Sequence, residues 1–70
     1  MVDLKEVFAE NLRQLRRKRG WTQEELADRS GLSSRFIGSV ERAQASPTIT
    51  VLGQLAAALE IDPAELFRRR

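Results

Sequence analysis

The sequence contains no cysteine and no histidine, and it has only two prolines among its 70 residues. Without cysteine, neither disulfide bonds nor thiolate metal sites can stabilise the chain. Without histidine, it lacks the commonest general base and the commonest metal ligand. The carboxylates show no spacing typical of a metal site or an acid/base pair. We therefore expect no catalytic residue, no metal, no cofactor and no enzymatic activity.

Long apolar runs are also missing. The longest, LAAAL at 55–59, is far too short to span a membrane. The N-terminus carries Asp3 and does not resemble a signal peptide. A chain of this length corresponds to one domain with a small core. We expect a single cytoplasmic domain over residues 1–70, with no membrane partner and no small-molecule ligand.

The net charge is only +2, from 12 basic and 10 acidic residues, so the total says little about a partner. The distribution says more, because RQLRRKR at 13–19 holds five cations and no anion. Such a run can simply be a solvated helix end that complements the helix dipole. We interpret Arg13, Arg17 and Arg19 as contributors to a positive field rather than as specific contacts.

Helix boundaries are marked by capping residues. Three pairs have capping-box spacing: Asp3 with Glu6, Thr22 with Glu25, and Asp62 with Glu65. Gly20 and Gly31 occupy C-terminal positions at which a positive φ is expected. With the apolar periodicity, these signals predict helices near 3–19, 23–30, 34–42, 49–59 and 63–68. The fold class is therefore all-α, with five helices.

The segment QEELADRSGLSSRFIGSVE at 23–41 contains two short helices joined by a tight turn at Gly31. Ala27 lies in the middle of the first helix, where a larger side chain would hold the second helix away. Ile37 and Val40 supply apolar contacts from the second helix. This combination predicts a helix-turn-helix unit at about 23–42.

Gly38 lies near the middle of the second of these helices, where a glycine costs about 1 kcal/mol relative to alanine. One face of this helix is small, polar and basic, and consists of Ser34, Arg35, Gly38, Ser39 and Arg42. We interpret Gly38 as a position that allows a large partner to approach closely. The alternative is that Gly38 packs against another helix.

The stretches TQEELADRSGLS, FIGSVERA and SPTITVLGQLAAALEI resemble the phage-repressor and Cro-like (XRE) family of helix-turn-helix regulators. The resemblance covers roughly residues 8–67. It implies a lambda-repressor-like domain of five helices, whose third helix enters the major groove of DNA. Small stand-alone members, such as restriction–modification controller proteins, are similar in length.

The resemblance also implies roles for individual residues. It makes Ser34, Arg35 and Ser39 candidates for base contacts, makes Gln23, Ser33 and Arg42 candidates for phosphate contacts, and pairs Arg16 with Glu41 in a structural ion pair. The chemistry agrees for Arg35, because a guanidinium can donate two hydrogen bonds to guanine. It agrees for Gln23, because the N-terminus of a helix favours an anion. A solvated glutamine, and a C-terminal helix charge at Arg42, are the alternatives.

Two positions depart from the family pattern, in which glycine is usual. The chain has Ala43 after the E-R pair and Glu60 after the A-x-A-L run. If the backbone at these sites still needs a positive φ, each departure costs about 1 kcal/mol. Otherwise the two loops follow a different path.

A single short recognition helix contacts few base pairs, so useful specificity favours a homodimer on a two-fold-related DNA operator. We expect the last two helices to form the dimer interface, through Thr50, Gln54, Ala57, Ile61 and Phe67. The sequence thus predicts a sequence-specific, double-stranded DNA-binding transcriptional regulator. The alternative function is a protein-interaction module, such as an antitoxin or a coactivator-like adaptor, on the same fold.

Overall fold

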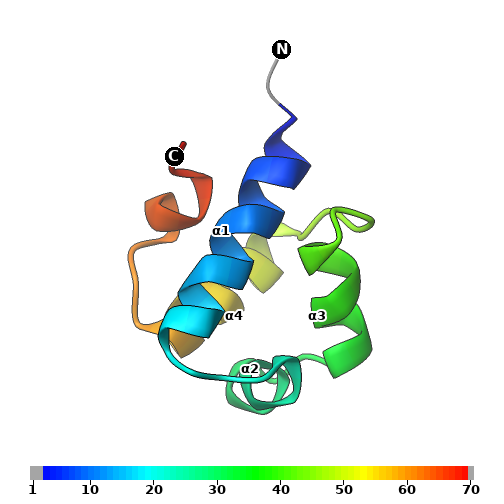
Figure 1. Cartoon of the computed structure of the whole chain (residues 1–70), viewed down its shortest axis with the longest axis vertical. Helices are drawn as coiled ribbons and strands as arrows, with labels where there is room; N and C mark the ends of the chain where they lie inside the picture. The colour runs from blue at the N-terminus through cyan, green and yellow to red at the C-terminus, as the bar shows by residue number, and fades with distance from the viewer. Residues whose placement is uncertain (1–2, 70) are drawn as a thin grey trace.

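The computed structural model describes residues 3–69, so the ends of the predicted 1–70 domain lie outside the described residues. The elements in chain order are α1 (Leu4–Lys18), α2 (Gln23–Ser30), α3 (Ser34–Glu41), α4 (Ile49–Leu59) and the 3₁₀ helix η1 (Pro63–Phe67) (Figure 1). Residues 3–69 contain no strand. The all-α prediction is confirmed, but the count of five α-helices is not, because the last element is a 3₁₀ helix.

The 3₁₀ helix η1 is short because its end contacts a distant segment of the chain. Asp62 and Pro63 start it as expected, but the backbone is already extended again at Arg68. Asn11 on α1 donates hydrogen bonds from its side-chain amide to the carbonyl oxygens of Leu66 (3.1 Å) and Arg68 (2.7 Å). Because these carbonyls bind a side chain of α1, the segment docks onto α1 after five residues.

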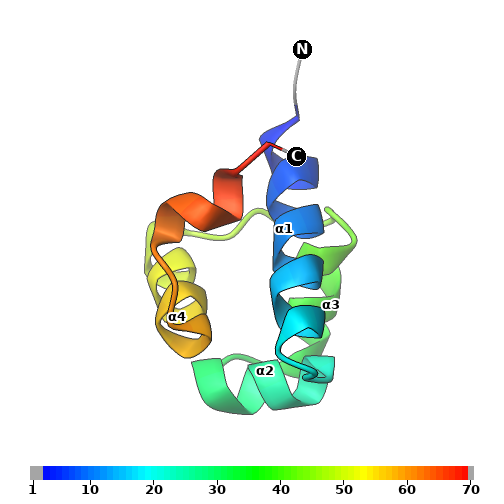
Figure 2. The same cartoon turned by 60° about the vertical axis from the view of Figure 1, so that its left-hand side comes forward.

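The four α-helices and the 3₁₀ helix η1 enclose one apolar core. Figure 2 shows α4 on one side of the molecule and α1 with α3 on the other, with α2 across one end. The side chains between them are almost completely buried: Phe8, Leu12, Leu26, Ile37, Val40, Leu55, Leu59 and Leu66. Leu4, which continues the apolar stripe of α1 in the sequence, is 61% exposed instead, because α1 extends past the core at this end.

The helix caps agree with the sequence in part. Thr22 and Glu25 form a complete capping box at the start of α2. Ser33 and Thr48 accept hydrogen bonds from the backbone N–H three residues later, as N-caps of α3 and α4. Asp3 accepts from the N–H two residues later, so its spacing with Glu6 does not give a full box, and Asp62 behaves in the same way.

The predicted helix-turn-helix is present in α2 and α3. Gly31 ends α2 with φ +76°, in the left-handed region, and α3 begins three residues later at Ser34. Ala27 is only 5% exposed at the contact between the two helices. Gln54 of α4 donates to the Ser30 carbonyl oxygen (3.2 Å), which satisfies one free carbonyl at the end of α2.

A buried ion pair holds α3 against α1. The guanidinium of Arg16 donates from Nε to Glu41 Oε2 (2.6 Å) and from Nη2 to Glu41 Oε1 (3.0 Å). Its third contact runs from Nη1 to the carbonyl oxygen of Trp21 (2.7 Å). The hydrogen bond to Glu41 raises the pKa of Arg16 above its ordinary value, although burial alone would lower it. Arg16 therefore stays charged while the protein is folded.

Arg13 reinforces the same junction. Its Nη1 donates to the backbone carbonyl oxygen of Glu41, which is one of the free carbonyls at the C-terminus of α3. From the sequence we expected Arg13 to contribute only to a positive field. In the structure, Arg13 and Arg16 bind the backbone and the side chain of the same residue, so part of the basic run at 13–19 is structural.

Ala43 and Glu60 both adopt the left-handed conformation, with φ +59° and +56°. The backbone at both sites thus adopts a conformation that suits glycine. The Cβ atoms of Ala43 and Glu60 make it sterically unfavourable. Backbone hydrogen bonds hold both sites: Ala43 N–H donates to the Val40 carbonyl (3.0 Å) and Glu60 N–H to the Ala57 carbonyl (3.1 Å). The departures from the family pattern therefore carry a steric cost at both sites.

Replacing Ala43 by glycine is expected to stabilise the protein. Glycine adopts φ +59° without steric cost, so Ala43→Gly should raise the free energy of unfolding by up to about 1 kcal/mol. The melting temperature should rise by roughly 4–8 °C per kcal/mol in a domain of this size. The matched control is Gly20→Ala, at φ +73° with no atom within 4 Å of the added methyl, which should lower stability. An unchanged melting temperature for both variants would contradict the strain argument.

Removing one partner of the buried ion pair is expected to lower the free energy of unfolding strongly. Arg16→Met leaves Glu41, which is 2% exposed, without its main partner and should cost about 3–5 kcal/mol. This is comparable to the total stability of so small a domain. Urea unfolding followed by circular dichroism measures the loss. The double variant Arg16→Met/Glu41→Leu removes both charges and should recover most of it, and a double variant no more stable than the single one would refute the pairing.

Candidate nucleic-acid interface

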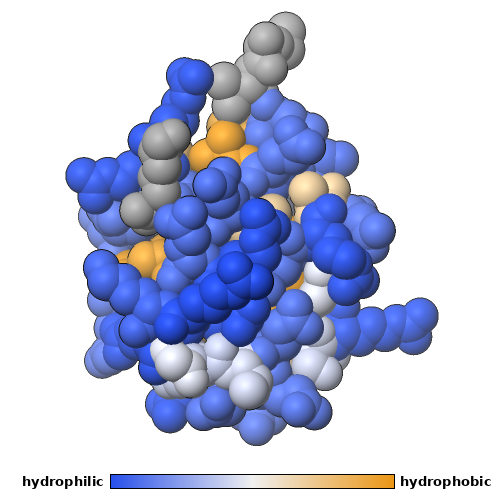
Figure 3. Space-filling view, viewed as in Figure 1, coloured by the Kyte–Doolittle hydropathy of each residue, from blue (hydrophilic) through white to orange (hydrophobic). Residues whose placement is uncertain are grey.

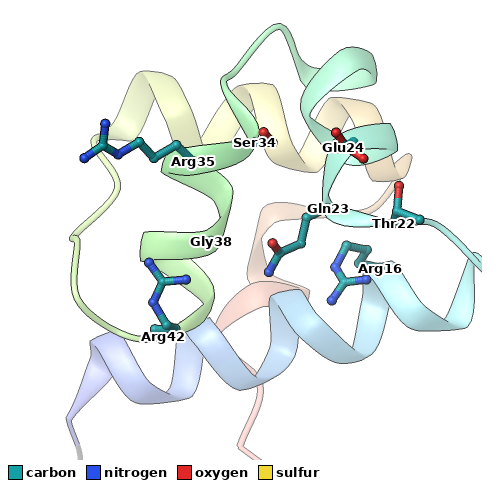
Figure 4. A pocket seen from close by; sticks show the side chains of 8 residues that line it. All are labelled: Arg16, Thr22, Gln23, Glu24, Ser34, Arg35, Gly38 and Arg42. Atoms are coloured by element: carbon teal, nitrogen blue, oxygen red, sulfur yellow. The ribbon is translucent and has the colours of Figure 1, made fainter.

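A cleft lies between the start of α2 and the outer face of α3. Its volume is about 630 Å³, and it is wide open to solvent. Figure 4 shows the side chains that line it: Arg16, Thr22, Gln23, Glu24, Ser34, Arg35, Gly38 and Arg42. Three of these eight residues are arginines, and Glu24 is the one carboxylate, so the lining favours an anionic ligand.

The N-terminus of α2 opens into this cleft. The first backbone N–H groups of a helix have no intrahelical acceptor, and they carry the positive end of the helix dipole. Gln23 is the first residue of α2, and its Nε2 donates to Glu41 Oε1 (3.0 Å). A primary amide has two N–H donors, so one remains for a ligand in the cleft. The Arg16–Glu41 ion pair that the family resemblance implied is present, and the structure adds Gln23 to it, which the sequence did not indicate.

The start of α3 presents the candidate base-contacting residues to solvent. Ser34 and Arg35 are both exposed, and in Figure 4 the Arg35 side chain points outward from α3, away from Gln23 and Arg16. Ser33 is exposed as well, and its hydroxyl oxygen accepts from Phe36 N–H (3.0 Å) as the N-cap. A hydroxyl that accepts can still donate, so Ser33 keeps its proton available for a phosphate.

Ser39 is placed differently from the other two base-contact candidates. It is only partly exposed, and its hydroxyl donates to the carbonyl oxygen of Arg35 within the same helix (3.2 Å). Its proton is therefore engaged, and it can offer only acceptor lone pairs to a ligand. Of the three candidates, Ser34 and Arg35 are the two whose side-chain donors make no hydrogen bond within residues 3–69.

Arg42 lies at the C-terminal end of α3, and its side chain runs back along the helix. The Nε atom donates to Gln44 Oε1 (3.1 Å). In Figure 4 the guanidinium points towards Gly38, on the side of α3 that also faces Gln23. Gly38 itself is buried, so its backbone is not open to a large partner as the sequence led us to expect.

The candidate dimer residues are not equally available. Thr50 and Ala57 are exposed on α4, and Ile61 is partly buried. The amide of Gln54 is engaged with the carbonyl of Ser30. Phe67 is 39% exposed, and its ring packs against that of Phe8 with centroids 5.4 Å apart. Ile49, which the sequence pattern did not single out, is the most exposed large apolar side chain among residues 3–69, at 87%.

Other kinds of site are scarce in the part of the chain that the structure describes. Residues 3–69 contain no group of three His, Cys, Asp or Glu side chains placed to hold a metal ion. None of the helices described is both long and apolar enough to cross a membrane. Figure 3 shows that the face presented by α1 and α3 is covered mainly by hydrophilic residues, with small hydrophobic areas between them.

Comparison with known sequences places the chain in a family. The family model HTH_3, described as helix-turn-helix, matches residues 12–66. The control protein C.SmaI of Serratia marcescens is 42% identical over 69 residues, which cover 99% of this chain and 82% of that protein. The uncharacterized HTH-type transcriptional regulator y4dJ of Sinorhizobium fredii is 40% identical over 65 residues, which cover 93% and 84%.

Solved structures agree with these matches. The restriction-modification controller protein C.AhdI from Aeromonas hydrophila is similar with a TM-score of 0.87 and 43% identity, over 90% of this chain and 96% of that one. The hypothetical transcription factor NHTF from Neisseria has a TM-score of 0.90 and 36% identity, over 94% and 76%. The resemblance stated from the sequence is thereby confirmed: the chain belongs to the XRE-type helix-turn-helix family of regulators.

Proposed function

We propose that this protein is a sequence-specific, double-stranded DNA-binding transcriptional regulator that acts in the cytoplasm as a homodimer. The observation that carries the proposal is the cationic cleft between α2 and α3, which joins the N-terminus of α2 to the exposed Ser34 and Arg35. The relatives named as transcriptional regulators and as a control protein support the same function.

Direct readout of bases falls to the start of α3. The major groove admits an α-helix, and a guanidinium can donate two hydrogen bonds to O6 and N7 of a guanine. Arg35 is exposed, and no hydrogen bond described here engages its guanidinium, so it can reach a base without breaking a contact in the protein. Ser34 beside it is short, which lets the N-terminus of α3 enter the groove.

Phosphate contacts flank this reading element on both sides. Gln23 and the first N–H groups of α2 provide donors at one edge of the cleft, and Arg42 provides a cation at the other. Ser33 lies next to the base-contacting residues and keeps its hydroxyl proton. Contacts of this kind fix the register of a protein on the duplex but carry no sequence information themselves.

The length of α3 limits how much sequence one chain can read. Its eight residues span about 12 Å, which is the length of three to four base pairs. A pair of chains related by a two-fold axis would read two half-sites about one helical turn apart. We assign the dimer contact to Thr50, Gln54, Ala57, Ile61 and Phe67, because exposed apolar surface on Phe67 accompanies the exposed residues of α4.

Selection of binding sites from a random duplex pool tests the function directly, and it supplies the operator for quantitative work. On that operator, Arg35→Ala should weaken binding by about 1–3 kcal/mol and relax the preference for one base pair. Gln23→Ala should instead weaken binding to all duplexes alike and reduce the dependence on salt. Fluorescence anisotropy with specific and scrambled duplexes separates the two effects.

The charge control for these variants is Lys18→Ala. Lys18 lines a different cleft, formed with Leu15 and Leu59, so its loss removes one positive charge away from α3. A protein-interaction module on the same fold would bind DNA weakly and would be insensitive to Arg35→Ala. If neither Arg35→Ala nor Gln23→Ala changes affinity for the selected operator, the proposed site is wrong.

The dimer is tested by charge insertion on α4. Ala57→Glu places a carboxylate at the centre of the proposed interface and should convert dimers to monomers, because an unpaired charge is costly to bury. Sedimentation velocity measures the conversion, and Gln14→Glu on the exposed side of α1 is the control. A monomeric wild-type protein on the full operator would refute the homodimer, whereas a dimeric Ala57→Glu variant would refute only this interface.

A further inference from the structure

Gly38 sits in a shallow depression on α3 that the side chains of two other candidate contacts cover. A Cβ atom added to Gly38 would lie 3.0 Å from Arg42 Nη1 and 3.5 Å from Gln23 Oε1. The three nearest atoms are all in the side chains of Arg42 and Gln23, and none belongs to the backbone or the apolar core. The space that the missing methyl group leaves is thus occupied by the end of Arg42.

From this geometry we infer that Gly38 is a positioning residue that seats the Arg42 guanidinium at the mouth of the α2–α3 cleft, where it binds a phosphate of the DNA backbone. The inference rests on the proposed DNA-binding function and adds to it the reason for a glycine inside α3. It replaces the sequence-based interpretation in which the glycine itself approaches the DNA.

The direction of side chains on a helix explains why residue 38 controls residue 42. Helical side chains lean towards the N-terminus and lie over the residue four positions earlier. Arg42 therefore folds back over position 38, as Figure 4 shows. A methyl group at position 38 would lie 3.0 Å from Arg42 Nη1, so the guanidinium would have to shift from its present place.

Two further contacts keep the guanidinium directed into the cleft. Gln44 accepts the Nε hydrogen of Arg42 (3.1 Å), which leaves the Nη donors pointing towards Gly38 and Gln23. The nearest carboxylate in α3, Glu41, is buried and already bound by Arg16 and Gln23. Arg42 is consequently not drawn into the internal ion pair, and its charge remains available to an anion.

A double-mutant cycle on the selected operator tests whether Gly38 positions Arg42 or contacts the DNA directly. Gly38→Ala should weaken binding to about the same extent as Arg42→Ala, by roughly tenfold, as expected for one charge-assisted hydrogen bond. It should also lower the slope of log affinity against log salt by about one. In the Arg42→Ala background, Gly38→Ala should have no further effect, because there is no guanidinium left to displace.

The matched control is Gly53→Ala, the other glycine inside a helix, with no atom within 4 Å of the added methyl. Both alanine variants should raise the melting temperature by a few degrees, because alanine favours the helix. Only Gly38→Ala should lose affinity. Sedimentation of Gly53→Ala must first show the oligomeric state of the wild type.

Further affinity loss from Gly38→Ala in the Arg42→Ala background would overturn the inference, because the new methyl group would then meet the DNA itself. Unchanged affinity of the single Gly38→Ala variant would overturn it as well. If Gly38→Ala does not fold, Gln44→Ala decides: it should weaken binding two- to threefold, but not in the Arg42→Ala background. If none of these variants, Arg35→Ala and Gln23→Ala included, changes the affinity for the operator, DNA binding at this site is refuted instead.

Discussion

The carboxylate of Glu41 is the point on which the position of α3 depends. It is 2% exposed and accepts hydrogen bonds from Arg16 on α1 and from Gln23 at the start of α2. A buried charge is tolerated only when it is paired and hydrogen-bonded, so α1, α2 and α3 must adopt one relative arrangement. Because the cost of desolvating two charges offsets most of their attraction, the Arg16–Glu41 pair adds little net stability. It does fix the orientation of α3, the helix that carries Arg35.

Five of the arginines among residues 3–69 show two different physical roles. Arg13, Arg16 and Arg19 donate to carbonyl or carboxylate oxygens of α3 and of the end of α4, and Arg16 is the buried one of the three. Arg35 and Arg42 remain on the outer face of α3. The densest basic run in the sequence therefore serves the fold in large part, and of its cations Arg16, which is bound to Glu41, lines the cleft together with Arg35 and Arg42. Counting charges along the chain does not make this distinction.

Local conformational preferences are overridden at several positions, and each instance lies next to the recognition unit or the end of α4. Ala43 and Glu60 adopt a backbone conformation that favours glycine, and Gly38 occupies a helix that favours alanine. Each costs about 1 kcal/mol in a domain with little stability in reserve. Local backbone hydrogen bonds at the end of α3, such as Gln44 N–H to the Ser39 carbonyl oxygen (2.9 Å), hold the conformation of Ala43.

The sequence by itself determined the all-α class, the helix boundaries to within a residue or so, and the helix-turn-helix, because caps, glycines and apolar periodicity act within a few residues. It also indicated Ser34, Arg35 and the other candidate contacts, whose DNA roles stay predictions. Only the tertiary structure decided that the last element is a 3₁₀ helix, that Arg13 is structural and that Gly38 lies beneath Arg42. These outcomes depend on contacts between distant segments, such as Asn11 with Leu66, and local patterns do not encode which distant atoms will meet.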